Sequence, residues 1–172
     1  MIRLAGGLLI VCSCSAMGWL KARELTERVA QLEQLELAVR LLQVETGFSQ
    51  TLLPEVLLKI SRELQAPVAS LFARTGKKLK SKQKIYFYQV WKQELMDSQK
   101  YMSLQETDLQ FLKEWGGRTG SCSQTEQGKI NQLTLKKLEM AQQQARQDVQ
   151  KKGKMYRWGG VLGGLLLVLL FI

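Results

Sequence analysis

Two runs of uncharged residues occupy the ends of the chain, and a polar sequence rich in Leu, Gln, Lys and Glu lies between them. The first run covers residues 4–20 and the second covers 158–172. At about 1.5 Å per helical residue, the first would span roughly 25 Å, and the second, extended back to Met155, roughly 27 Å. Because the hydrocarbon core of a bilayer is about 30 Å thick, the pattern predicts transmembrane helices at 1–20 and 158–172 around a helical domain at 21–157.

Positive charge beside the two runs predicts the orientation of the chain. Lys21, Arg23 and Arg28 follow the first run, further basic residues precede the second, and only Arg3 lies on the other side. Basic residues concentrate on the cytoplasmic side of membrane proteins. The domain at 21–157 is therefore expected in the cytoplasm, with both termini across the membrane.

The first run has two other interpretations. Ser13 and Ser15 give the small-x-small pattern of a cleaved signal peptide, and Cys12 would be the modified residue of a lipoprotein signal, although Val11 and Cys14 fit that signal poorly. Either kind of processing would place the strongly basic middle outside the cell. The charge pattern argues against that outcome.

The middle of the chain carries apolar residues at helical spacing. Steps of three and four residues recur in six successive segments, and β-branched residues are sparse, so the pattern predicts six amphipathic helices that pack as antiparallel neighbours. The predicted fold class is all-α: a six-helix cytoplasmic bundle flanked by N- and C-terminal transmembrane helices. The positions expected in the core are Leu25, Val29, Leu32, Leu35, Val39, Leu42, Leu57, Ile60, Leu64, Val68, Leu71, Phe72, Tyr88, Trp91, Leu95, Leu109, Leu112, Trp115, Ile130, Leu133, Leu138, Ala141, Ala145 and Val149.

Capping and breaking residues predict where these helices begin and end. The segments 103–106 and 123–126 both read S-x-x-E, the capping box of a helix N-terminus. The glycine pair at 116–117 is expected to end the fifth helix. Gly153 leaves two alternatives open: a hinge before the second apolar run, or a helix that continues into it.

The side-chain chemistry excludes several classes of function. Histidine is absent, which removes the commonest general base and zinc ligand, and the cysteines Cys12, Cys14 and Cys122 form no metal-binding pattern. Gly76-Lys77 and Gly128-Lys129 both lack the first glycine of a P-loop. We therefore expect no catalytic residue, metal, cofactor or small-molecule substrate, and the protein is not predicted to be an enzyme.

Three segments resemble a known family, the stage III sporulation protein AB family. They are LLPEVLLKISRELQAPVASLF (52–72), EWGGRTGSCSQTEQGKINQL (114–133) and KKGKMYRWGGVLGGLLLVLLFI (151–172). The likeness covers nearly the whole chain and depends on the order and spacing of the segments. The chain departs from the family pattern at Thr119, and at Ser123, where the family commonly carries aspartate. Serine keeps the capping role but lacks the negative charge of aspartate.

The resemblance implies a place in the cell and a set of partners. Members of the family sit in the mother-cell membrane around the forespore, and their cytoplasmic domain is similar to the type II secretion system F protein domain. The implied partners are the secretion-type ATPase of the stage III sporulation complex and the other membrane subunits of that complex. Together they form a channel between the two cells, in which this chain would be a platform.

A formal charge of +10, from 25 Lys plus Arg against 15 Asp plus Glu, makes basic clusters the candidate partner sites. The densest cluster joins the third and fourth predicted helices, and the glycine-rich loop adds two further residues. The interpretations of the lysines are a solvated loop, attraction to anionic headgroups, docking on an acidic face of the ATPase, and nucleic-acid binding. The candidate partner-binding residues are Lys77, Lys78, Lys80, Lys82, Lys84, Arg118 and Ser123.

Glycines in the second apolar run are candidate sites of helix packing. Gly159 with Gly163 and Gly160 with Gly164 have the small-xxx-small spacing that lets helices approach closely in a membrane. We expect them to contact the other span of the chain or another subunit. The favoured function is thus a non-enzymatic membrane platform without nucleic-acid binding, and the alternative is a membrane-tethered basic module that binds nucleic acid.

Overall fold

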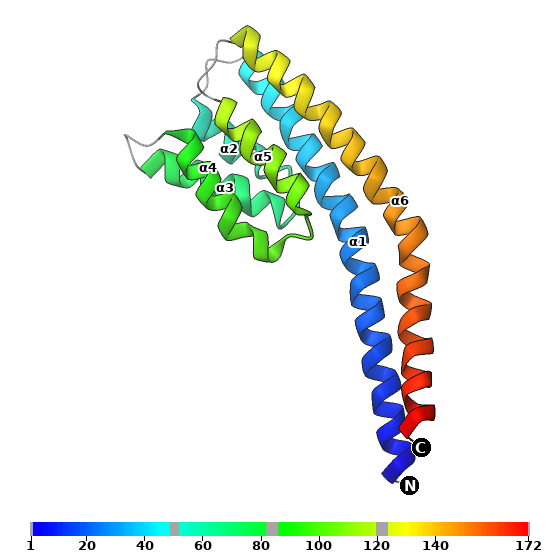
Figure 1. Ribbon diagram of the computed structural model, residues 1–172. Helices are drawn as coiled ribbons and strands as arrows, with labels where there is room; N and C mark the ends of the chain where they lie inside the picture. Colours follow the sequence, from blue (N-terminus) through cyan, green and yellow to red (C-terminus); the bar gives the residue numbers. More distant parts are fainter. Residues whose placement is uncertain (1, 49–51, 82–85, 120–123, 172) are drawn as a thin grey trace. The chain divides into compact units, whose positions relative to one another are not determined.

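The computed structural model describes residues 2–48, 52–81, 86–119 and 124–171, and helices make up most of these ranges (Figure 1). No strand occurs in them, so the predicted all-α class is confirmed for the described part of the chain. The elements in chain order are α1 (Ile2–Phe48), α2 (Leu53–Ile60), α3 (Val68–Ser81), α4 (Phe87–Ser98), the 3-10 helix η1 (Gln99–Tyr101), α5 (Glu106–Arg118) and α6 (Gln124–Phe171).

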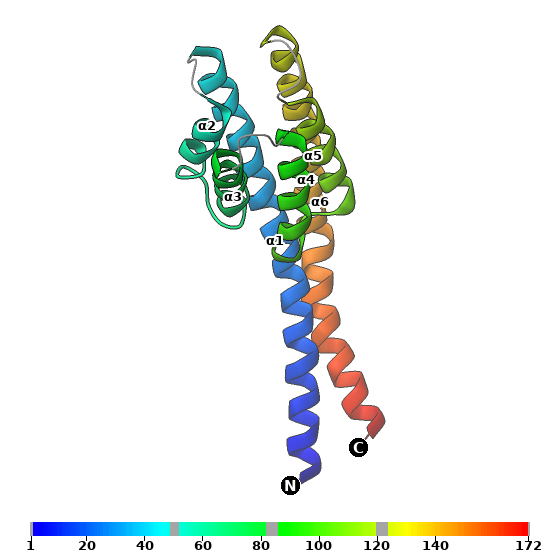
Figure 2. The same cartoon turned by 90° about the vertical axis from the view of Figure 1, so that its left-hand side faces the viewer.

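The chain divides into two compact units. The helix pair contains α1 up to Val29 and α6 from Gln143 onward, and the central unit contains residues Ala30–Gln142. Within the helix pair, α1 and α6 run antiparallel and side by side in both views (Figures 1 and 2). The central unit holds α2 to α5 together with the remaining turns of α1 and α6.

The two long helices remain unbroken where the sequence changes from apolar to polar. Lys21 lies inside α1 and Gly153 lies inside α6, with helical backbone on both sides. The helix therefore continues through Gly153, which settles the alternative that the sequence left open.

Aromatic side chains form the centre of the core of the central unit. Trp91 of α4 makes edge contacts with Phe72 of α3 and Trp115 of α5, at centroid separations of 5.4 and 5.0 Å, and stacks on Phe87 at 5.8 Å. The indole N–H of Trp91 donates to the carbonyl oxygen of Leu112 at 2.9 Å, so its polar atom is satisfied inside the core. The predicted core positions Leu32, Leu35, Val39, Leu42, Leu57, Ile60, Leu64, Val68, Leu71, Phe72, Trp91, Leu95, Leu109, Leu112, Trp115, Leu138 and Ala145 are all buried. Five other predicted core residues are only half-buried: Leu25, Val29, Ile130, Ala141 and Val149.

Two predicted core residues are wrong. Tyr88 is 42% exposed, and the neighbouring Phe87 takes the buried position. Leu133 is 58% exposed, because the buried face of α6 follows Asn131 and Thr134 instead. A pattern of apolar residues alone assigns these faces incorrectly, since polar side chains occupy core positions on α6.

The buried polar side chains of α6 have hydrogen-bond partners. Asn131 accepts from the indole N–H of Trp115 at 3.2 Å and from the amide of Gln127 at 3.2 Å. Gln142 donates to the carbonyl oxygen of Leu32 at 3.3 Å and to the Glu36 carboxylate at 2.6 Å, which links α6 to α1. Their burial is possible because each group has a partner.

The start and the glycine pair of α5 differ from the prediction. The helix begins two residues later than the box at 103–106 predicts: the Gln105 backbone N–H donates to Asp108 at 2.9 Å. The glycines at 116–117 lie inside α5, which ends at Arg118. A Cβ atom on Gly116 would stand 2.1 Å from Trp91 Cδ1, so this glycine makes room for an indole instead of stopping the helix. The predicted cap at Ser123 lies outside the described residues.

Candidate functional site

The described lysines of the basic cluster lie on a helix, where the sequence predicted a loop. Lys77, Lys78 and Lys80 belong to the C-terminal part of α3, which continues to Ser81. Positive charge is favourable there, because the helix dipole places partial negative charge at a C-terminus. Lys82 and Lys84 lie outside the described residues, so their place in the cluster stays a prediction.

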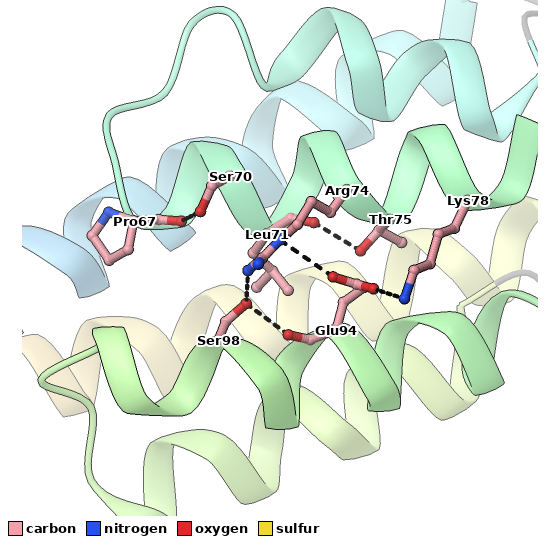
Figure 3. A network of polar contacts seen from close by, with 8 residues as sticks. All are labelled: Pro67, Ser70, Leu71, Arg74, Thr75, Lys78, Glu94 and Ser98. Atoms are coloured by element: carbon pink, nitrogen blue, oxygen red, sulfur yellow. Dashed lines mark hydrogen bonds and ion pairs between the residues drawn. The ribbon is translucent and has the colours of Figure 1, made fainter.

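Lys78 is held by a buried carboxylate on the next helix (Figure 3). Glu94 of α4 is 2% exposed, and its two oxygens contact the Lys78 ammonium group and, at 3.3 Å, Nε of Arg74. The Ser98 hydroxyl donates to the Glu94 carbonyl oxygen at 2.6 Å and accepts from Arg74 at 2.5 Å. A buried carboxylate requires such partners, so Arg74 and Lys78 serve first to join α3 to α4.

The remaining described lysines of the cluster face solvent. Lys80 is exposed and lies 3.6 Å from Glu55 of α2, a surface pair of the kind that contributes little to stability. Lys77 is exposed and makes no ion pair with the residues that the structure describes. Lys77 and Lys80 therefore present the accessible positive charge of this helix end.

Arg118 belongs to a different surface. It lines a hollow of about 120 Å³ between α5 and α6, together with Trp115, Ile130 and Lys137. Lys137 also pairs with Glu114 across the same two helices at 3.1 Å. The structure thus does not bring Arg118 into the α3 cluster, and its predicted companion Ser123 lies outside the described residues.

The outer surface of the helix pair is strongly apolar. Within the described ranges, no helix is both long enough and apolar enough to cross a membrane. The pair nevertheless exposes large apolar side chains, in contrast to the scattered single residues that are normal on a soluble surface. These side chains are Leu9, Met17, Trp19, Leu20, Met155, Trp158, Val161, Leu162, Leu165, Leu166 and Leu169.

Three glycines allow the two helices of the pair to approach closely. A Cβ atom would stand 2.7 Å from the Cys14 carbonyl oxygen if added to Gly160, and 3.0 Å from Val11 Cα if added to Gly164. On α1, a Cβ atom on Gly18 would stand 2.4 Å from the Tyr156 carbonyl oxygen. Gly18 was not predicted from the sequence, because it has no glycine four positions away, in contrast to the glycines of the second run.

The other two candidate glycines have no such contact. A Cβ atom on Gly159 or Gly163 would meet nothing within 4 Å. Of the two predicted small-xxx-small pairs, the one made by Gly160 and Gly164 is therefore the pair that lies against α1. The role of all four in membrane packing stays a prediction.

Charged residues form a layer where the apolar surface ends. Arg28 is buried beside Asp148 at 3.7 Å, and Lys152 contacts the same carboxylate at 2.7 Å. On α1, Lys21 pairs with Glu24 at 2.8 Å. Hydrogen bonds to these carboxylates raise the pKa of Lys21 and of Lys152 above its ordinary value, so both remain charged at neutral pH.

The fold defines an all-α protein whose two long helices contribute both to a central helical unit and to an apolar pair. The profile of the stage III sporulation protein AB family matches residues 3–172. The chain is 31% identical to the stage III sporulation protein AB of Bacillus subtilis (strain 168). The alignment spans 172 residues and covers both chains completely. A solved structure of a stage III sporulation protein AB matches with a TM-score of 0.67 and 28% identity, over 72% of this chain and 96% of the other.

The chain belongs to the stage III sporulation protein AB family. This confirms the resemblance that the three sequence segments indicated, and it supports a role in sporulation.

Proposed function

We propose that the chain is a non-enzymatic membrane platform of the sporulation channel between mother cell and forespore, and that it docks a cytoplasmic secretion-type ATPase. The observation that carries the proposal is the exposed apolar surface of the helix pair, on a chain whose central unit has a buried core of its own. Lipid is the solvent that suits such an apolar surface.

The pairing of the two apolar helices is compatible with a position in lipid. The close contacts at Gly18, Gly160 and Gly164 join them into one antiparallel pair. Small residues allow backbones to pack in lipid, where no hydrophobic effect drives helices together. In the proposal, the pair enters the mother-cell membrane around the forespore, both termini lie across it, and the central unit faces the mother-cell cytoplasm.

The buried polar groups of the central unit support a structural role over an enzymatic one. Glu94 is held by Arg74 and Lys78, and Asn131 is held by Trp115 and Gln127. Each group therefore joins one helix to another, which is a structural role. ATP hydrolysis in this proposal belongs to a separate chain.

The exposed lysines of α3 are the proposed contact for the ATPase. Lys77 and Lys80 carry accessible charge, which would steer an acidic partner surface and raise the rate of association. Lys78 is excluded from this role because Glu94 holds it.

Capture of the ATPase from the stage III sporulation complex by the full-length chain in detergent tests this contact. The double variant Lys77→Glu, Lys80→Glu is expected to weaken capture at least tenfold, about 1.4 kcal/mol. The control Lys129→Glu, Lys136→Glu makes the same charge change at exposed residues of α6 and is expected to bind normally. Equal weakening in both variants, or capture of DNA and not of the ATPase, would overturn the docking proposal.

A further inference from the structure

Two lysines and a tryptophan share one face of α6 at the point where its polar part meets its apolar part. Lys151, Lys154 and Trp158 are exposed, and Trp158 is 68% exposed. At 100° per residue they fall within an arc of about 60°, which continues along the helix through Leu162, Leu165 and Leu169. This arc lies on the side of α6 opposite to Gly160 and Gly164, which contact α1.

The two lysines differ from the other basic residues of this layer in having no acidic partner. Lys152 pairs with Asp148, Lys21 pairs with Glu24 and Arg23 pairs with Glu27. Lys151 and Lys154, in contrast, make no ion pair with any residue in the described ranges. Their two ammonium groups therefore add positive charge beside an exposed indole ring.

The spacing along the helix matches the layers of a membrane surface. Lys154 is one turn, about 6 Å, before Trp158, and Lys151 is about 10 Å before it. Indole rings favour the boundary between headgroups and hydrocarbon, and long lysine stems let the charge reach toward that level. Beyond the ring, Leu162, Leu165 and Leu169 offer an apolar track of the kind that acyl chains cover.

We propose that Lys151, Lys154 and Trp158 form a headgroup site for an anionic phospholipid of the surrounding bilayer. The two lysines bind the headgroup phosphate, the indole ring lies at the glycerol level, and the acyl chains lie along the leucine face. The proposal rests on membrane insertion of the helix pair as set out under the proposed function. It adds to that function the class of lipid that is bound and the residues that bind it.

Tryptophan quenching by brominated lipids tests the site in the full-length chain reconstituted in nanodiscs. A Trp19→Phe background leaves Trp158 as the exposed tryptophan, because Trp91 and Trp115 are buried. Brominated phosphatidylglycerol is expected to quench more strongly than brominated phosphatidylcholine at the same mole fraction. The local enrichment should be roughly fivefold for each lysine, as for basic residues near an anionic surface.

The variant Lys151→Gln, Lys154→Gln should lose this lipid preference, whereas the control Lys129→Gln, Lys136→Gln should keep it with the same net charge. Equal quenching by both lipids in the unsubstituted chain, or a preference that survives in the double variant, overturns the headgroup site and leaves the membrane anchor standing. Quenching by neither lipid places Trp158 outside the bilayer, and it then overturns the anchor as well.

Discussion

At the scale of single residues, the packing of Trp91 against α5 depends on one glycine. The indole ring occupies the space that a side chain at Gly116 would need, and its N–H donates to the Leu112 carbonyl oxygen. Gly117, the next residue, is exposed, and a Cβ atom there would make an ordinary contact of 3.5 Å with Tyr88. The two adjacent glycines therefore provide a matched test of the core.

Gly116→Ala is expected to destabilise the central unit by about 1–3 kcal/mol, because the new methyl group must displace a fully buried ring. Gly117→Ala should be neutral or stabilising by up to about 1 kcal/mol, because alanine is the better helix former. Urea unfolding of the full-length chain in detergent, followed by tryptophan fluorescence, measures both. Equal stabilities would contradict the position of Trp91.

The residue scale also shows the limit of reading the sequence alone. Helical spacing located Trp91 and Leu95 correctly, but it gave no reason to expect that Glu94 between them is buried. Its partners Arg74 and Lys78 come from another helix, and only tertiary packing brings the three together. The one available signal was an acidic residue on the apolar side of a predicted helix.

At the scale of elements, the order and type of the helices followed from the sequence. Apolar periodicity predicted α2 to α5, and the absence of proline between residues 143 and 171 allowed α6 to continue. Ends were less predictable: the N-terminus of α5 uses Gln105 and Asp108, and Ser103 donates its backbone N–H to Gln31 of α1. Several polar residues could cap this helix, and contacts with α1 select among them.

The pairing of α1 and α6 gives a prediction at this scale. Gly160→Leu should separate the two helices, because its side chain would meet the Cys14 carbonyl oxygen, whereas Gly159→Leu should leave them in place. Spin labels at Leu9→Cys and Leu169→Cys, in a chain whose native cysteines are replaced by serine, report the separation by pulsed electron resonance. The expected result is a longer and broader distance distribution for Gly160→Leu only. If both variants match the parent chain, the glycine contact does not hold the pair together.

At the scale of the whole molecule, the proposed function depends on a difference between the two parts of each long helix. One part of α1 and α6 contributes to a central unit with a core of its own, and the other part exposes leucine and tryptophan to its surroundings. Composition predicted this division, because charge is excluded from both ends of the chain. The proposed partner surface differs from the predicted one, since Lys78 contacts Glu94, whereas Lys77 and Lys80 are exposed.

Alkaline carbonate extraction of membranes from cells that express the full chain tests membrane insertion of the helix pair most directly. The chain should remain in the membrane pellet, because its apolar side chains contact lipid and not other proteins. A variant with Leu165→Lys and Leu166→Lys, which places two charges on that surface, should be released to a large extent. Release of the unsubstituted chain by carbonate would contradict the proposed anchor, and with it the platform.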